Sequence, residues 1–203
     1  MPTTIYNNGL VFPDINFKEC GNDVEIHAPI SLIKPEKMTL GSHIIIGDYS
    51  VINGGDGLHI GHHVHISANC TIIGGGYTII EDFVTIGYGV RLIVGSELVK
   101  GEGLCNPTIP TDYRAMKREH IWLQKHVFLG ANVVIHPGIT IGEGSVVGSG
   151  SVVTRNLDPW GIYMGQPAGR KADREKYIII SKEKQLLKSE GLQNTACKYW
   201  MEG

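Results

Sequence analysis

The chain has 203 residues with a formal net charge of −2 at pH 7, and 27 of its residues are glycine. This length allows one or at most two domains, and the small net charge gives no reason to expect a nucleic acid or an anionic membrane as a partner. The sequence shows no signal segment and no apolar run of the roughly 18 residues that span a membrane. We therefore expect a cytoplasmic protein.

Residues 1–19 carry no repeat and are expected to form a lead-in to a domain over 20–170. Within that domain an aliphatic residue recurs every six positions, often with glycine directly after it. A period of six fits neither a helix nor a simple alternating strand. It is typical of an all-β fold, a parallel β-helix in which each hexad forms one side of a triangular coil. The clearest positions are Leu40, Ile46, Ile52, Ile60, Ile66, Ile72, Ile80, Ile86 and Leu92.

The early coils also repeat every twenty residues. Three hexads make only eighteen, so each early coil holds two extra residues at one corner. These extra residues fall at 54–55, at 74–76 and near 34–35, and we expect them to stack into a ridge. Cys20 and Cys70 occupy apolar repeat positions, so both are expected to be buried thiols without a metal. The longer period is marked by Cys20, Leu40, Ile60 and Ile80.

The hexads stop after Leu92 and resume at Leu123, which leaves about 25 residues beyond a normal coil. The segment over 95–120 holds three glycines and two prolines, so we expect a protruding loop, and a loop of this length inside a compact repeat is usually functional. After the last coil, residues 171–203 are charged and are expected to form a short helical tail. Ser181 is the predicted N-cap of that helix.

The strongest motif lies near the end of the repeat. The block from Ile141 to Arg155, followed by Gly165-Gln166-Pro167-Ala168, closely resembles the hexapeptide-repeat acyltransferases, in particular their sugar and galactoside O-acetyltransferase branch. The loop motif Asn106-Pro107-Thr108 and the turn over 158–163 look like a subgroup from O-antigen and capsule clusters. The resemblance covers roughly residues 20–172. It implies a left-handed β-helix, a homotrimer with active sites between adjacent columns, and acetyl-CoA or another acyl-CoA as the donor.

The resemblance also assigns roles to particular residues. Small corner residues let the pantetheine arm approach the backbone, and cations near the end of the column hold the CoA phosphates. The alternative interpretation is that the small residues only shape the corners and that the cations are only solvated charges at the end of the column. Tyr113 and Arg114 in the loop are candidates for holding the acceptor's hydroxyl or diphosphate. The positions assigned to CoA are Ala131, Ser149, Thr154, Arg155, Arg170 and Lys171.

The catalytic base is the least determined part of the site. Galactoside acetyltransferases place a histidine at the start of the long loop, where hexad counting gives Glu97 in this chain. His65 precedes a core isoleucine and therefore points outward, and we expect the loop to emerge on the same side. A histidine oriented by a carboxylate is a sensible base, so the prediction is His65 as base with Glu97 as its partner.

Other histidines keep alternatives open. His120, His126 and His136 compete for the role of base, and His62 with His63 beside His65 invites a metal hypothesis, although no metal is expected. An amine acceptor that binds already deprotonated would need no histidine at all.

The expected activity is transfer of an acetyl group from CoA to a hydroxyl or amino group of a sugar or nucleotide-linked sugar, in O-antigen, capsule or lipopolysaccharide biosynthesis. One alternative is a γ-type zinc carbonic anhydrase, for which Gly61-His62 is present but Ser67 replaces the histidine five positions later. The other is a non-catalytic β-helix scaffold. The acceptor itself cannot be read from the loop.

Overall fold

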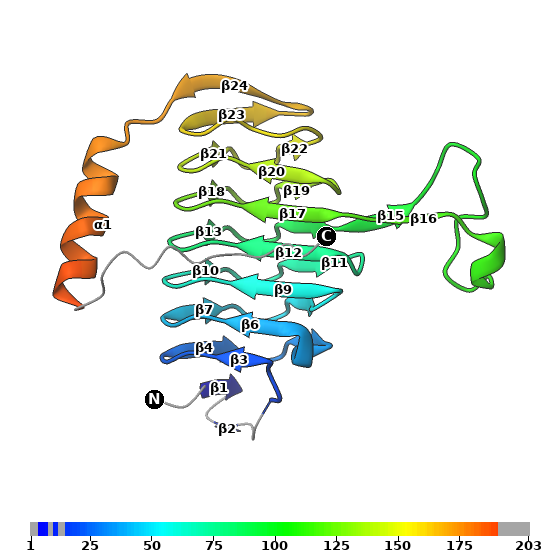
Figure 1. The fold of residues 1–203 in the computed structure, drawn as a ribbon, viewed down its shortest axis with the longest axis horizontal. Helices are drawn as coiled ribbons and strands as arrows, with labels where there is room; N and C mark the ends of the chain where they lie inside the picture. The colour runs from blue at the N-terminus through cyan, green and yellow to red at the C-terminus, as the bar shows by residue number, and fades with distance from the viewer. Residues whose placement is uncertain (1–3, 8–9, 12–14, 191–203) are drawn as a thin grey trace.

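The computed structural model describes residues 4–7, 10–11 and 15–190. The chain winds into a column of stacked coils with three flat faces, with one helix along one side and a long arm projecting from another (Figure 1). Each face is a sheet whose strands run parallel from coil to coil, so the predicted parallel β-helix is confirmed.

We name the faces A, C and B, in the order in which the chain visits them. Face A contains β4 (Val24–His27), β7 (Ile44–Ile46), β10 (His65–Ile66), β13 (Thr85–Ile86), β18 (Phe128–Leu129), β21 (Val146–Val147) and β23 (Gly161–Gly165). Face C contains β5 (Ser31–Ile33), β8 (Val51–Asn53), β11 (Thr71–Ile73), β14 (Arg91–Ile93), β19 (Val134–Ile135) and β22 (Val152–Val153). Face B contains β3 (Glu19–Cys20), β6 (Met38–Leu40), β9 (Gly57–Ile60), β12 (Tyr77–Ile80), β17 (His120–Leu123) and β20 (Ile139–Ile141).

The core is the interior of the column, which the hexad residues fill. Ile46, Ile66, Ile86 and Leu129 stack on face A and are each at most 2% exposed. Their neighbours on the same strands point outward because successive side chains of a strand alternate. The prediction for Cys70 is confirmed, since it is 2% exposed. The prediction for Cys20 is wrong: β3 is the edge strand of face B, so no further coil covers it, and Cys20 is exposed.

The predicted ridge is present at the corner between faces C and B. It comprises the 3₁₀ turn η1 (Pro35–Lys37) and the glycine turns at 54–55 and 74–76. Strands are paired with a spacing of twenty residues up to this height, as in His65 with Thr85, and of eighteen above it, as in Phe128 with Val146. The two extra residues per early coil therefore lie where the sequence places them.

The long loop grows from the top of the same ridge as a β-hairpin arm (Figure 1). Its base is β15 (Gly95–Glu97) paired antiparallel with β16 (Met116–Arg118), and its outer part holds a second 3₁₀ turn, η2 (Thr111–Tyr113). Gly74, at φ +110°, lies against the backbone of Gly95, and a Cβ at position 74 would overlap it. The ridge glycine therefore leaves room for the arm to depart.

Both ends of the chain extend the column beyond the predicted boundaries. Within the expected lead-in, β1 (Thr4–Asn7) pairs in parallel with β4, and β2 (Leu10–Val11) pairs with β1. At the other end, β24 (Ala168–Asp173) pairs antiparallel with β23, so the sheet continues past residue 170. No helix among the described residues is long and apolar enough to cross a membrane.

Helix α1 (Tyr177–Ser189) confirms the short helical tail, but it begins before the predicted cap. Ser181 lies inside the helix. The carboxylate of Glu175 instead accepts hydrogen bonds from the backbone N–H groups of Lys176 and Tyr177, at 2.9 and 3.0 Å. These N–H groups have no partner within the helix, and a carboxylate near the helix start also complements the helix dipole, so an acidic residue supplies the cap expected from serine.

We expect substitutions of two adjacent isoleucines to have unequal effects on the stability of the column. Ile72 is 1% exposed inside the column, and Ile73 is 40% exposed outside it. Ile72→Ala should lower the free energy of unfolding by about 2–5 kcal/mol, because it leaves a cavity, while Ile73→Ala should cost much less. Chemical denaturation of both variants checks this, and equal losses would contradict the assigned orientation of the hexads.

A second prediction concerns the ion pair that holds the base of the arm. Glu97 at its base accepts a hydrogen bond from Arg114 Nε at 2.9 Å, and both side chains are largely shielded from solvent. Glu97→Gln should loosen the arm, and a loss of about 1.4 kcal/mol in local opening would make tryptic cleavage there about tenfold faster. Glu102→Gln, in the exposed part of the arm, is the matched control. Unchanged cleavage in Glu97→Gln would show that the ion pair does not hold the arm.

Candidate functional site

His65 and Glu97 lie on different sides of the column. His65 is exposed on face A, between Ile45 of β7 and Thr85 of β13. The arm that carries Glu97 leaves from the C–B corner, which is opposite face A in a three-sided column. The expectation that the loop emerges beside His65 is therefore wrong for a single chain. Hexad counting predicts the height of Glu97 along the column but not the side of the column on which the arm lies.

The structure instead pairs Glu97 with a residue predicted to bind substrate. The side chains of Glu97 and Arg114 form an ion pair with exposed fractions of 17% and 12%. The second carboxylate oxygen of Glu97 is buried without a hydrogen-bond partner among the described residues. Tyr113, one residue earlier, is 65% exposed. Arg114 is thus occupied by the arm's own structure, whereas Tyr113 is open to a ligand.

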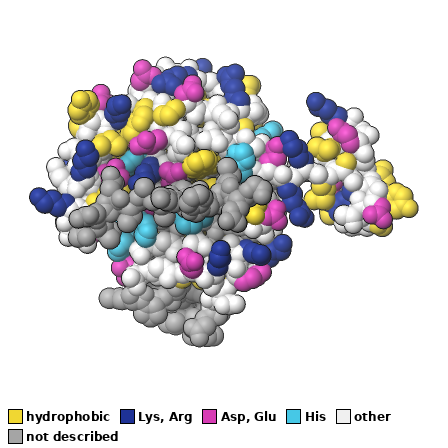
Figure 2. Space-filling view, viewed as in Figure 1, with side chains coloured by type: hydrophobic (Ala, Val, Ile, Leu, Met, Phe, Trp, Pro, Cys, Tyr) yellow, Lys and Arg dark blue, Asp and Glu magenta, His cyan; other side chains and the backbone are white. Residues whose placement is uncertain are grey.

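The arm stands clear of the column and shows hydrophobic side chains toward its end (Figure 2). Val99 is 81% exposed and Leu104 is 55% exposed. Face A carries exposed apolar residues as well, since Ile45 and Phe128 on either side of His65 and Thr85 are each 42% exposed. Exposed apolar side chains therefore occur on two separate surfaces, the arm and face A.

The positions assigned to pantetheine lie at the upper end of the column, at two corners that flank face C. Ala131 and Ser149 lie on the A–C corner in consecutive coils, and the next residue, Gly150, donates its backbone N–H to Ala131 O at 2.8 Å. A Cβ at Gly130 would lie 2.6 Å from Ser149 N, so the coils approach closely there. Thr154 follows β22 and lies on the C–B corner. The three residues therefore lie in two consecutive coils and at two different corners.

The three predicted phosphate-binding cations differ in availability. Arg155 and Lys171 are exposed, and neither has an ion pair among the described residues. Arg170 donates hydrogen bonds to Asp173 at 2.8 Å and to the Tyr163 hydroxyl at 3.0 Å. Arg155 and Lys171 can thus receive a phosphate directly, while Arg170 would first have to release a partner.

Two perturbed groups that the sequence did not single out lie on and beside face B. Burial lowers the pKa of His59, which favours the neutral imidazole. Burial also raises the pKa of Glu81, against hydrogen bonds that it accepts from Trp122 Nε1 at 2.7 Å and from the Lys125 backbone N–H at 3.0 Å. Such shifts often mark functional sites, but both oxygens of Glu81 are already bonded to the next coil, so this carboxyl joins coils. In the sequence, the one sign of an unusual environment for His59 is its place at an outward position of a hexad.

The histidines near residue 63 separate in the structure. His62 Nδ1 accepts a hydrogen bond from Ser42 N at 3.0 Å, while His65 lies on face A. Of the competing bases, His120 lies on β17 of face B, and His136 is exposed after β19. The cluster of three that invited a metal hypothesis is therefore not formed.

His63 and His126 belong instead to an aromatic ladder at the B–A corner. Five side chains at equivalent corner positions lie one above another, with ring centroids 4.7 to 6.2 Å apart and backbone φ near +60°. Helix α1 is tied to this ladder through His126 and Glu183, whose side-chain atoms are 3.0 Å apart. The ladder residues are His43, His63, Phe83, His126 and Trp160.

Known proteins are similar to this chain in sequence. The family described as bacterial transferase hexapeptide (six repeats) matches residues 120–155. A dTDP-4-amino-4,6-dideoxy-D-glucose acyltransferase of Escherichia coli is 26% identical over 175 residues, which are 86% of this chain and 91% of that protein.

Solved structures extend the likeness to the arrangement in space. AntD, an N-acyltransferase from Bacillus cereus in complex with dTDP and 3-hydroxybutyryl-CoA, superposes with a TM-score of 0.82 at 32% identity, over 87% of this chain and 93% of that one. A variant of AntD with dTDP-4-amino-4,6-dideoxyglucose and coenzyme A gives 0.80 at 33% identity, over 86% and 92%. The acetyltransferase VCA0836 of Vibrio cholerae, at 24% identity and a TM-score of 0.53 over 79% and 73%, shares the fold. The chain belongs to the hexapeptide-repeat acyltransferases.

Proposed function

We propose that this protein transfers an acyl group from an acyl-CoA to the amino group of a nucleotide-linked amino sugar, with dTDP-4-amino-4,6-dideoxyglucose as the first candidate. The observation that carries the proposal is the match to AntD, which spans nearly the whole of both chains at more than 30% identity. The relative from Escherichia coli, named for acyl transfer to the same amino sugar, supports it independently.

Acyl transfer from a thioester to an amine requires only one proton acceptor from the protein. The amine attacks the thioester carbonyl, a C–N bond forms, the C–S bond breaks, and the nitrogen loses a proton while coenzyme A leaves as the thiol. An amine is a stronger nucleophile than a hydroxyl, so the base has only to remove one proton from nitrogen. This agrees with Glu97 at the height where the galactoside enzymes have a histidine, because Glu97 here pairs with Arg114. We assign His65 as the group that accepts the proton.

The donor is placed at the upper end of the column. The close approach of coils at Gly130 and the exposed Ser149 leave backbone groups of the A–C corner accessible to an amide-bearing pantetheine chain. Arg155 and Lys171 supply positive charge at the same end for the CoA phosphates. These roles are part of the proposal, as are location in the cytoplasm and a place in surface polysaccharide synthesis.

The acceptor site is formed between columns. His65 on face A and Tyr113 on the arm lie on opposite sides of one chain, so they can meet only when the arm of one chain lies against face A of a neighbour. The exposed apolar residues of the arm and of face A, Val99 and Leu104 on one side and Ile45 and Phe128 on the other, support that contact. In a closed ring of three chains, each arm contacts face A of one neighbouring chain.

The acceptor class is tested by a matched pair of sugars. The enzyme is given acetyl-CoA and either dTDP-4-amino-4,6-dideoxyglucose or dTDP-6-deoxyglucose, which has a hydroxyl in place of the amino group, and thiol release is followed. Release with the amino sugar only is the expected result. Equal release with the hydroxyl sugar would make the enzyme an O-acyltransferase. No release with either, together with no CoA binding, would favour a non-catalytic scaffold. Running 3-hydroxybutyryl-CoA beside acetyl-CoA defines the acyl chain.

The shared site is tested by mixing two inactive variants. One carries His65→Ala, which should slow transfer by about 10²-fold or more if His65 is the base. The other has residues 98–115 replaced by Asn-Gly, which closes β15 onto β16 with a two-residue turn. When the two are unfolded and refolded together, about one site in four should combine an intact face with an intact arm and recover activity. Full activity of His65→Ala alone would refute the base, and no recovery from two inactive variants would refute the shared site.

A further inference from the structure

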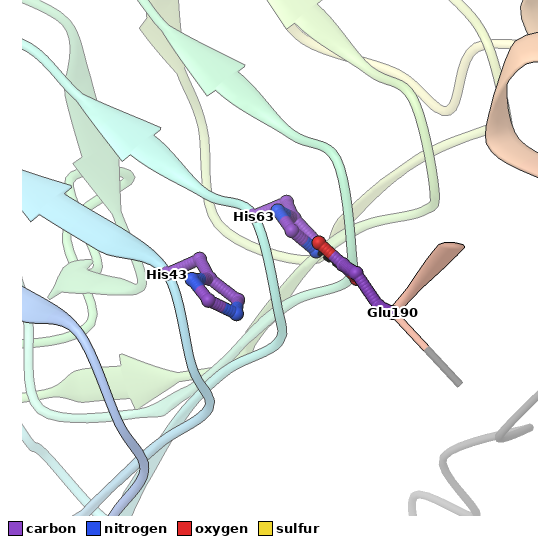
Figure 3. Close-up of side chains that lie close together, drawn as sticks. All are labelled: His43, His63 and Glu190. Carbon is purple, nitrogen blue, oxygen red and sulfur yellow. Dashed lines mark hydrogen bonds and ion pairs between the residues drawn. The ribbon is translucent and has the colours of Figure 1, made fainter. Parts of the chain in front are cut away.

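The lower end of the aromatic ladder gathers three side chains that can each offer a metal ligand. His43, His63 and Glu190 place one ligand atom each within 4.8 Å of the other two. His63 Nε2 is 3.1 Å from a carboxylate oxygen of Glu190. Figure 3 shows both imidazoles extending from the corner toward the side from which Glu190 approaches. None of these residues belongs to the acyl-transfer site proposed above.

The repeat itself brings the two histidines together. They are twenty residues apart, so they occupy the same corner in consecutive coils, with φ values of 60° and 55°. Equal backbone geometry sends both side chains in one direction, and the rings stack with centroids 4.7 Å apart and planes 12° from parallel. The ligand atoms therefore lie side by side without any loop to position them.

Helix α1 delivers the third ligand. Glu190 follows the last helical residue, and its backbone N–H donates to Leu186 O at 3.0 Å. The start of the tail is held against the column by Arg174, which donates hydrogen bonds to the carbonyl oxygens of His126 and Gly144 at 2.8 and 2.9 Å. The middle is held by Glu183 at His126. With two points fixed, the helix end is directed to the height of His63.

We propose that His43, His63 and Glu190 bind one divalent transition-metal ion, with Zn²⁺ as the first candidate. Imidazole suits zinc, copper and nickel, whereas magnesium and calcium prefer oxygen ligands. Two histidines and one glutamate form a known protein ligand set for zinc, with the fourth position open to water. Bonds of about 2.1 Å set neighbouring ligand atoms about 3.4 Å apart around a tetrahedral ion. The ligand atoms close from 4.8 Å if the exposed ring of His43 turns and the Glu190 carboxylate rotates, while His63, whose side chain is 18% exposed, keeps its stacking on Phe83.

A neighbouring carboxylate supports the assignment. Asp23 Oδ2 lies 3.4 Å from His43 Nδ1, which leaves Nε2 of the same ring for the metal. A carboxylate beside the second nitrogen is the usual companion of a metal-binding histidine, since it fixes the ring and its tautomer. The next ladder position is Phe83, which stacks in the same way but offers no metal ligand. Among the described residues, His43 and His63 are the ladder histidines that share one nearby carboxylate.

The ion would fasten the end of α1 to the corner turns that precede β7 and β10. Binding to the folded chain and not to the unfolded one raises stability with ion concentration. Metal binding in this arrangement does not depend on acyl transfer, so its test needs no substrate.

The test is titration of the metal-free, full-length protein with Zn²⁺ in a calorimeter. We expect one ion per chain, and we expect His43→Ala and Glu190→Gln each to weaken binding by about 100-fold or more, because even an outer partner of a metal site contributes 10- to 100-fold. His136→Ala, which removes an exposed histidine at another corner, is the control and should bind as the natural protein does. The thermal midpoint should rise with Zn²⁺ in the natural protein and in the control only.

Two outcomes would overturn the proposal. One is stoichiometric binding that neither His43→Ala nor Glu190→Gln alters, which would place the ion elsewhere. The other is the absence of measurable binding up to millimolar Zn²⁺, which would leave the three residues as a stacked pair of rings with one ion pair. Circular dichroism of the variants without metal shows whether each one folds, and failed acyl transfer would affect neither result.

Discussion

The structure depends on the pairing of each coil with the coils above and below it. Strands of only two to four residues, such as His65–Ile66, have no stability alone. They persist because Ile66 lies between Ile46 and Ile86 in the interior while the backbone pairs on both sides. Stability in such a solenoid comes from neighbours, and every coil must therefore keep its register. Any side chain at a given place in one coil then has an equivalent directly above and below it.

Because every coil keeps the same register, residues at equivalent positions form rows along the column. The B–A corner becomes an aromatic ladder, and on face A the exposed Ile45 and Phe128 lie on either side of His65 and Thr85. Where face A ends at the A–C corner, glycines at equivalent positions, such as Gly87 and Gly130, let consecutive coils approach closely. Strand partners in consecutive coils are eighteen or twenty residues apart where no insertion intervenes, and the arm lengthens this separation, as between Thr85 and Phe128. The helix after the column lies along one of these rows, since Glu183 contacts His126 and Glu190, directly after the helix, contacts His63.

The period of six predicts the faces, the ridge and the arm because these features follow from chain length per coil. The same counting did not predict the pairing of Glu97 with Arg114, since two residues seventeen apart meet only through the hairpin that the arm forms. Nor did it predict the cluster of His43 with Glu190, because the path of α1 along the corner is set by contacts with Arg174 and Glu183 rather than by any repeat. The exposure of Cys20 reflects a column end, which a periodic pattern does not mark.

The way the arm joins the column has a consequence for which changes of sequence the fold can accept. The chain leaves at Gly95 and returns at Glu119, whose backbone N–H donates to Val94 O at 2.8 Å and whose carbonyl accepts from Tyr77 N at 3.1 Å. The two ends of the arm are therefore hydrogen-bonded to each other and to the coil below. The residues between them do not affect how the strands of the column are paired. Insertions, deletions and exchanges in this segment leave the core untouched. The length and composition of the arm can therefore change while the strand pairing of the coils stays the same.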